Sequence, residues 1–187
     1  CLQNNDIVFF INAKLDILGR FKMLFNRHRL LCDSLQSCRE RGLDYRGVAV
    51  VTPDISDAEL ERLSELGVCG VRLNLIFAGG LRWRDVVLLA DRLAHFKWHL
   101  ECLIDVSTFR DMEARLGSLP VPVVIDHMGH LAATRGPECP GFAALCRLLK
   151  QGRTWVKLSA PYRLRQRPTG RPSRPVRRRC WRPAPYQ

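Results

Sequence analysis

Two apolar runs that each turn polar at their carboxyl end place the strongest constraint on the fold of this 187-residue chain. The first is Val121-Pro-Val-Val-Ile-Asp-His-Met-Gly129, and the second is Trp155-Val-Lys-Leu-Ser-Ala-Pro-Tyr-Arg163. Short β-branched runs without alternation are typical of strands that are buried on both faces of a parallel α/β sheet. In a parallel α/β barrel the chemistry lies at the carboxyl ends of the strands. His127 and Arg163 are therefore predicted active-site positions.

Strand and helix patterns alternate along most of the chain. Ser56 and Glu59 form a capping box before one helix, and Gly67 is placed to end it. Strands that alternate with helices of this length predict right-handed βαβ units and a parallel α/β sheet. A complete (β/α)8 TIM barrel needs ~250 residues, so we predict an incomplete one with about five central βα units. The predicted strands are residues 46–51, 68–75, 99–105, 121–127 and 155–159.

The positive charge is concentrated near the carboxyl end. Residues 163–187 hold nine arginines and no acidic residue, so they supply all but +3 of the net charge of +12. Residues 165–187 combine Arg and Pro with few apolar side chains and are predicted to be a basic disordered tail. Residues 27–164 form the predicted barrel domain, and residues 1–26 are unassigned.

Cysteine usage and the length of the apolar runs bear on the cellular compartment. The eight cysteines show no C-x-x-C pair, which predicts reduced, structural thiols in a cytoplasmic protein. No apolar run approaches the ~20 residues of a membrane span, and no signal peptide is recognisable. We therefore predict no membrane partner, and the oligomeric state stays open.

The strand at residues 68–75 has one apolar face and one polar face. Arg72 and Asn74 share the polar face, which points into the interior of a barrel. A buried arginine is costly unless it meets a carboxylate. That carboxylate belongs either to a substrate or to a structural salt-bridge partner, Glu101 or Asp105. Arg72 and Asn74 are therefore candidate substrate-binding residues.

His127 is the candidate catalytic residue. The alternation along its strand predicts that Val123, Ile125 and His127 face the interior and that Asp126 faces the helix layer. With an ordinary pKa near ~6.5, a histidine can polarise a carbonyl, shuttle a proton or ligate a metal. The alternative is a histidine that is hydrogen-bonded within the core.

Two further basic residues lie near the end of the last predicted strand. The guanidinium of Arg163 can clamp a substrate carboxylate, although an ordinary loop arginine is the alternative. Lys157 is a weaker candidate because alternation alone does not decide which face of the strand it occupies.

Four segments in this order resemble the amidohydrolase-related TIM-barrel hydrolases, a family that includes the pyrone dicarboxylate lactonases. The resemblance implies hydrolysis of a small carboxylated lactone or similar cyclic ester. It also implies that His127 is the catalytic histidine and that Arg72 and Arg163 hold substrate carboxylates. The four segments are residues 45–51, 70–74, 122–129 and 155–163.

The chain also departs from the family pattern. It contains no His-x-His pair, and no strand follows Arg165 to carry the aspartate that activates water in the family. A reading-frame shift after Arg165 would produce such a tail. We therefore expect an incomplete copy that is weakly active or inactive. No cofactor is predicted, and a divalent metal such as zinc in full-length members is the alternative.

A second hypothesis makes the domain a non-catalytic scaffold. Its arginine-rich tail would then bind nucleic acid or another anionic surface. The nearly neutral domain and the few aromatic residues in the tail favour the hydrolase, whose partner would be a small carboxylated substrate.

Overall fold

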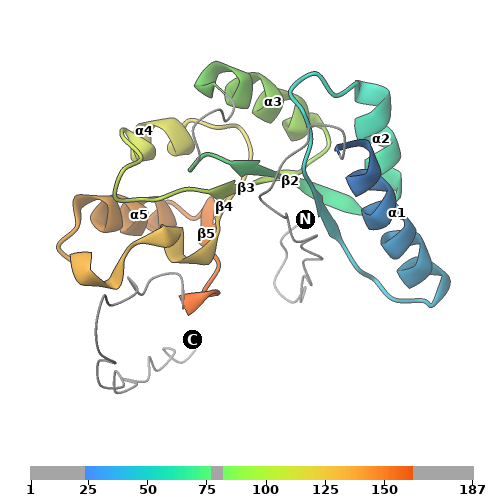
Figure 1. Ribbon diagram of the computed structural model, residues 1–187. Helices are drawn as coiled ribbons and strands as arrows, with labels where there is room; N and C mark the ends of the chain where they lie inside the picture. The colour runs from blue at the N-terminus through green and yellow to red at the C-terminus, as the bar shows by residue number, and fades with distance from the viewer. Residues whose placement is uncertain (1–23, 77–81, 162–187) are drawn as a thin grey trace, which may run out of the picture.

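The chain forms a five-stranded parallel β-sheet with the order β1-β2-β3-β4-β5, and the α-helices lie on its outer face (Figure 1). The computed structural model describes residues 24–76 and 82–161. This arrangement confirms the predicted α/β class and the five consecutive parallel strands. The predicted tail and most of the unassigned first segment lie outside the described residues. The strands are β1 (Gly47–Ala49), β2 (Val68–Asn74), β3 (His99–Leu103), β4 (Val123–Ile125) and β5 (Thr154–Val156).

Helix α1 precedes β1, and each of α2 to α5 falls between two successive strands, as the predicted alternation requires. Each crossover therefore returns the chain to a parallel strand, as βαβ units require. No helix in the described part of the chain is long and apolar enough to cross a membrane. The α-helices are α1 (Leu24–Glu40), α2 (Asp57–Glu65), α3 (Trp83–His95), α4 (Met112–Gly117) and α5 (Pro140–Lys150), and the short 3₁₀ turns are η2 (His127–His130) and η3 (Ala133–Arg135).

The predicted cap of α2 is confirmed. The Ser56 hydroxyl accepts a hydrogen bond from the Glu59 amide at 3.2 Å, which satisfies one of the amide groups left open at a helix amino end. At the other end the Gly67 amide donates to the Ser64 carbonyl at 3.0 Å. Helix α2 therefore begins directly after Ser56 and ends just before Gly67, as the sequence predicted.

The outer face of the sheet packs against the helices and forms the hydrophobic core. Val71, Leu100 and Ile125 on three neighbouring strands are fully buried there, as are Val86 and Leu93 of α3. Each fully buried aliphatic side chain of this size stabilises the fold by about 1.5–3 kcal/mol. This face therefore accounts for most of the apolar burial in the described residues.

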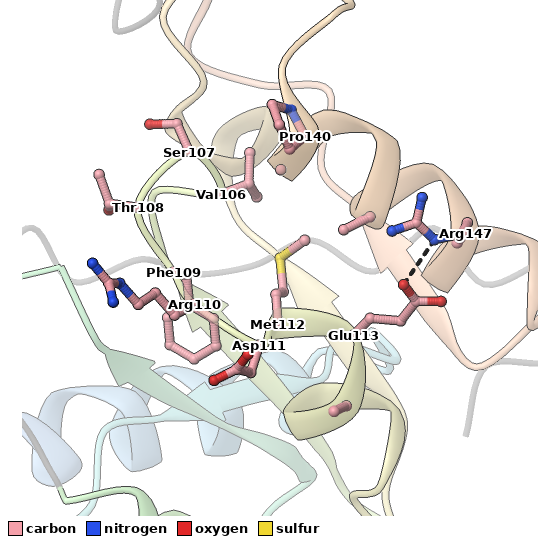
Figure 2. A pocket seen from close by; sticks show the side chains of 13 residues that line it. Val106, Ser107, Thr108, Phe109, Arg110, Asp111, Met112, Glu113, Pro140 and Arg147 are labelled. Atoms are coloured by element: carbon pink, nitrogen blue, oxygen red, sulfur yellow. Dashed lines mark hydrogen bonds and ion pairs between the residues drawn. The ribbon is translucent and has the colours of Figure 1, made fainter.

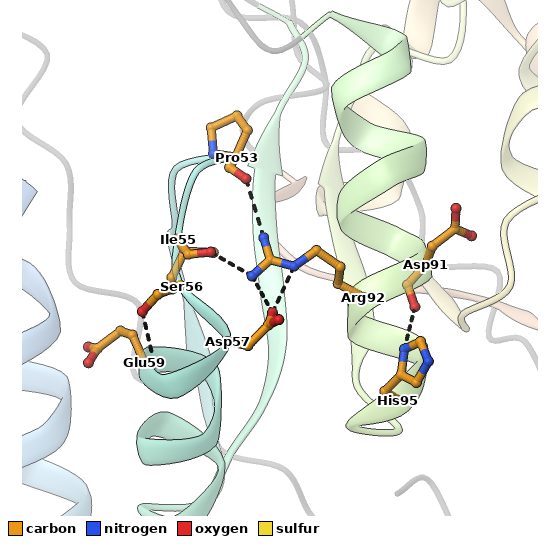
Figure 3. A network of polar contacts seen from close by, with 8 residues as sticks. All are labelled: Pro53, Ile55, Ser56, Asp57, Glu59, Asp91, Arg92 and His95. Carbon is orange, nitrogen blue, oxygen red and sulfur yellow. Dashed lines mark hydrogen bonds and ion pairs between the residues drawn. The ribbon is translucent and has the colours of Figure 1, made fainter.

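A network of polar contacts made by Arg92 of α3 holds the loop after β1 against that helix (Figure 3). The Arg92 guanidinium contacts the Asp57 carboxylate at 2.5 Å and donates to the carbonyls of Ile55 at 2.5 Å and Pro53 at 3.4 Å. Because this loop follows the carboxyl end of β1, Arg92 fixes one of the loops at the edge of the sheet where a barrel keeps its site.

Candidate active site

Four charged side chains meet on the face of the sheet that the helices do not cover, here called the inner face. Arg72 on β2 lies 2.7 Å from Asp126 and 3.6 Å from Glu101 on β3. Lys157, just beyond β5, lies 2.5 Å from Glu101 and 3.2 Å from Asp126. Both carboxylates are fully buried, whereas the two cations keep some exposure. We call these four residues the inner ion cluster; it pairs two positive with two negative charges.

The cluster shows which protein carboxylates pair with Arg72, a point that the sequence left open. The register pairs Arg72 with Glu101, so both point to the inner face as predicted. The structural salt bridge to Glu101 is present, and a second carboxylate, Asp126, joins it. Asp105 is not the partner, since its carboxylate accepts from the Ser107 amide at 2.8 Å and hydroxyl at 2.6 Å.

The predicted orientation of β4 was wrong. Val123 and Ile125 pack in the core on the outer face, and Asp126 is the residue that reaches the inner face. The register pairs Glu101 with Val124, so Val124 and, two residues later, Asp126 share the face of Glu101. A run that is apolar on both faces carries no information about which side chains point inward, and this is why alternation failed here.

His127 lies beyond the strand, in a left-handed turn. The backbone φ angles of His127, Met128, Gly129 and His130 are +50°, +54°, +66° and +50°. This region is costly for residues other than glycine and is concentrated at functional sites. The turn is held from two sides, by the Met128 amide bonded to the Lys157 carbonyl at 3.0 Å and by the Val106 amide bonded to the Gly129 carbonyl at 2.9 Å.

Among the residues that the structure describes, the imidazole of His127 meets the side chains of Ser159 and His130. Its Nδ1 lies 2.9 Å from the Ser159 hydroxyl, and its ring meets that of His130 edge-on at a centroid distance of 5.5 Å. No role was predicted from the sequence for Ser159 or His130. The signal for Ser159 was its place at the polar end of the last apolar run.

Burial shapes the acid–base properties of the inner face. Burial, and after it the charge of Asp126, raises the pKa of the Glu101 carboxyl, and Lys157 offsets part of this effect. His99 lies below the cluster on β3, and burial followed by the charge of Lys157 lowers its pKa to about 4. Its ring rests on Gly70, where a Cβ atom would lie 2.5 Å from the imidazole. The inner face therefore disfavours any uncompensated charge.

The remaining predicted site residues are less well defined. Asn74 ends β2 at an exposed position, where its side-chain oxygen accepts from the Ile76 amide at 3.3 Å. Arg163 lies outside the described residues. The structure therefore brings Arg72 against Asp126, the residue that precedes His127, and its described part does not bear on Arg163.

The described residues do not fit a metal ion. Within residues 24–76 and 82–161, no three His, Cys, Asp or Glu side chains converge on one point. The two inner carboxylates are already in contact with Arg72 and Lys157, and a hydrolytic zinc site wants about three protein ligands. No step of the chemistry is therefore derived through a metal.

A cavity of about 510 Å³ lies between the loop after β3 and helices α4 and α5 (Figure 2). Met112 and Val106 line it, and an ion pair between Arg147 and Glu113 closes one side at 2.7 Å. None of the predicted site residues that the structure describes, Arg72, Asn74 and His127, lines this cavity. Val106 in its lining lies close to Gly129 of the His127 turn.

The chain is similar in sequence and in fold to known hydrolases. The family model described as amidohydrolase matches residues 30–182. The 2-pyrone-4,6-dicarboxylate hydrolase of Comamonas testosteroni is 32% identical over 133 residues, which are 70% of this chain and 44% of that protein. The 4-sulfomuconolactone hydrolase of Hydrogenophaga intermedia is 27% identical over 124 residues, 64% of this chain and 41% of that protein.

A solved structure supports the same relationship. The crystal structure of a probable 2-pyrone-4,6-dicarboxylic acid hydrolase from Acinetobacter baumannii, with citric acid bound, superposes with a TM-score of 0.63 at 27% identity. The match covers 76% of this chain and 53% of that one. The chain thus spans about half the length of the relatives that it matches, and its five parallel strands correspond to part of a TIM barrel.

Proposed function

Because the chain belongs to the amidohydrolase family, we propose that it provides part of a hydrolase site for a small carboxylated lactone. The observation that carries the proposal is the position of His127 in a held turn beyond β4, directly after Asp126 of the inner ion cluster. Relatives that act on a pyrone dicarboxylate and on a sulfonated lactone support an anionic cyclic ester as the substrate class.

In this proposal His127 polarises the scissile carbonyl and Arg72 holds a substrate carboxylate. A hydrogen bond that strengthens as negative charge develops on the carbonyl oxygen lowers the barrier to attack by water. Asn74 and Arg163 are further candidate contacts to the substrate. The Arg72 side chain keeps 21% exposure beside two fully buried carboxylates, which supports this role because part of it stays accessible to a substrate.

The described residues offer no convincing base for the attacking water. Asp126 and Glu101 lie on the inner face, but each contacts both Arg72 and Lys157. Because these ion pairs occupy the carboxylate oxygens of both residues and both side chains are fully buried, neither is placed to take a proton from an attacking water. We therefore propose that the chain as given binds the substrate and turns it over slowly or not at all.

The experiment is a binding and turnover measurement on the full chain with 2-pyrone-4,6-dicarboxylate. Calorimetry should show binding that is about 10- to 100-fold tighter than for the pyrone without carboxylates, because charge-assisted hydrogen bonds to the carboxylates are lost in the control ligand. Equal affinity for the two pyrones, or no binding of either, would contradict the proposal.

Turnover is followed by the loss of pyrone absorbance. Any ring opening above the buffer rate should fall by about 10²–10⁴-fold in His127→Ala. Asp111→Asn, at an exposed left-handed position at the start of α4, is the matched control and should leave both measurements unchanged. Fast turnover that survives His127→Ala would rule out the role given to His127.

A further inference from the structure

We propose that Ser159 is the positioning residue that fixes the tautomer of His127, with its hydroxyl donating a hydrogen bond to Nδ1. The imidazole proton then resides on Nε2, so His127 presents a hydrogen-bond donor at its second nitrogen. This inference rests on the proposed function for its catalytic meaning, and on the geometry of the His127 turn for its physical basis.

The first observation is the contact itself. Ser159 Oγ lies 2.9 Å from Nδ1 in a partly buried setting, a good hydrogen-bond distance. A neutral imidazole carries one donor and one acceptor nitrogen, and the partner of one nitrogen decides which form is present. A hydroxyl can rotate to donate, so this contact is able to hold the proton on Nε2.

The second observation is that both partners are held by the backbone. The Met128 amide donates to the Lys157 carbonyl at 3.0 Å, which ties the His127 turn to the segment that carries Ser159. Opposite this, a Cβ atom at Gly129 would lie 2.4 Å from a methyl carbon of Val106, so the turn fits closely against the loop after β3. The distance between Ser159 and His127 is therefore set by three segments together.

The third observation is the conformational energy cost of the positive φ angles in the His127 turn. The three non-glycine residues of the turn, with φ between +50° and +54°, store strain that packing and hydrogen bonds must offset. An ordinary continuation of β4 would avoid this strain and would point the residue after Asp126 to the outer face. The turn instead brings the His127 ring to Ser159 at the carboxyl edge of the sheet.

A role in polarisation requires the Nε2–H form. If the scissile carbonyl accepts from Nε2–H, the hydrogen bond to the developing oxyanion strengthens without moving a proton to solvent. The opposite tautomer would leave Nε2 as an acceptor that repels a carbonyl oxygen. Ser159 therefore acts through His127 and is not itself proposed to touch the substrate.

The test reads the tautomer directly by NMR. Long-range ¹H–¹⁵N correlation spectra of the ¹⁵N-labelled full chain are recorded near pH 8, above the ordinary histidine pKa of ~6.5. The chain has five histidines, and His127→Gln identifies the signals of His127. We expect the Nε2–H form in the parent chain, a mixture of forms in Ser159→Ala, and recovery of the Nε2–H form in Ser159→Thr.

Two further variants sharpen the test. Ser118→Ala removes a serine hydroxyl that donates to the Arg115 carbonyl at the exposed end of α4, and it should change nothing at His127. If Ser159→Ala does not fold, Ser159→Cys keeps the size of the side chain with a weaker donor and should give a partial shift. An Nδ1–H form in the parent chain, or an unchanged Nε2–H form in the folded variants without the hydroxyl, would overturn the inference.

Kinetics separates this inference from the proposed function. Where pyrone dicarboxylate is hydrolysed, Ser159→Ala should lower kcat about tenfold with little change in KM, and Ser159→Thr should restore it. An absence of hydrolysis in the parent chain would count against the proposed activity, while the NMR result alone would still decide the role of Ser159.

Discussion

Both faces of the sheet carry fully buried side chains, but these are stabilised in different ways. On the outer face Val71, Leu100 and Ile125 exclude water by contact with the helices. On the inner face Glu101 and Asp126 are just as inaccessible, and they are tolerated because Arg72 and Lys157 neutralise them. On the outer face each apolar side chain contributes separately to the free energy of unfolding, so a single substitution is tolerated. On the inner face each charged side chain is stabilised only while its partners are present.

This difference predicts which substitutions the chain withstands. On the outer face a smaller side chain leaves a cavity whose cost grows with its volume. On the inner face the loss of one charge leaves its partners buried without compensation. The comparison of the two faces is therefore best examined by single substitutions, each with a matched control.

The largest effect is expected from Asp126→Asn in the inner ion cluster. Loss of this charge leaves Arg72 and Lys157 with one carboxylate, which typically costs about 3–5 kcal/mol of unfolding free energy. Removal of the Asp126 charge also relieves the raised pKa of Glu101, which offsets part of this cost. Urea unfolding measures the change, and Asp111→Asn at an exposed site should stay within about 0.5 kcal/mol.

On the outer face, Leu100→Ala should cost about 2–5 kcal/mol. Leu100 is fully buried in the middle strand of the sheet, so its removal leaves a cavity that neighbouring strands cannot easily fill. Leu88→Ala on α3 is the control, because Leu88 is 62% exposed and the same deletion there removes little buried surface. Equal costs at the two positions would show that the outer face is not the main core.

The contrast between the faces also explains how far the sequence could predict the structure. The strand order, the α2 cap and the inward orientation of Arg72 follow from local patterns, and all three are confirmed. The orientation of β4 did not follow, because its valines and isoleucine suit either face. The balance of charge explains it only once the structure places Lys157 beside Arg72: these two cations are paired with two carboxylates, Glu101 and Asp126.

Local sequence patterns likewise predict only part of the candidate site. His127 and Arg72 stand at the polar ends of recognisable strands, so residue type and position were sufficient to propose them. The His127 turn was not predictable, since only Gly129 among its four residues favours a positive φ. That turn is imposed by tertiary contacts with Val106 and with the segment after β5, and the contact with Ser159 follows from it.

Acidification should weaken the inner face through His99. Its pKa is lowered to about 4 by burial first and then by Lys157, so between pH 6.5 and about 4 the unfolded chain binds this proton and the folded chain does not. Stability is therefore complete above pH 6.5 and falls by up to about 3 kcal/mol as the pH drops toward 4. The raised pKa of Glu101 acts in the opposite direction, from its ordinary value of 4.5 upward.

The pH effect of His99 is isolated by comparison with a variant that cannot titrate. The difference in unfolding free energy between the parent chain and His99→Gln should shrink as the pH falls from 7 to about 4. Ser118→Ala at the exposed end of α4, which removes no titrating group, provides the control and should leave the pH profile unchanged. A constant difference across this range would show that His99 is not the titrating group.

Close packing between β2 and β3 on the inner face should make Gly70→Ala costly by about 1–3 kcal/mol. The added methyl group would lie 2.5 Å from the His99 ring, which is itself buried and cannot move away freely. Gly117→Ala at the end of α4 is the control, since its nearest neighbour is the flexible Gln151 side chain at 3.3 Å. A double variant with a smaller residue at position 99 should recover part of the loss.

The smallest effect is expected at the exposed ion pair between Arg147 on α5 and Glu113 on α4. Its atoms lie 2.7 Å apart, close to the 2.5 Å of the Lys157–Glu101 contact, yet both side chains are substantially exposed. Because water and salt screen such pairs, Glu113→Gln should cost less than about 1 kcal/mol, and 0.5 M salt should remove most of that cost. Glu101→Gln at similar geometry should cost several times more and should respond little to salt. If the two variants gave the same cost with the same dependence on salt, the charges on the inner face would not be stabilised differently from those at the surface.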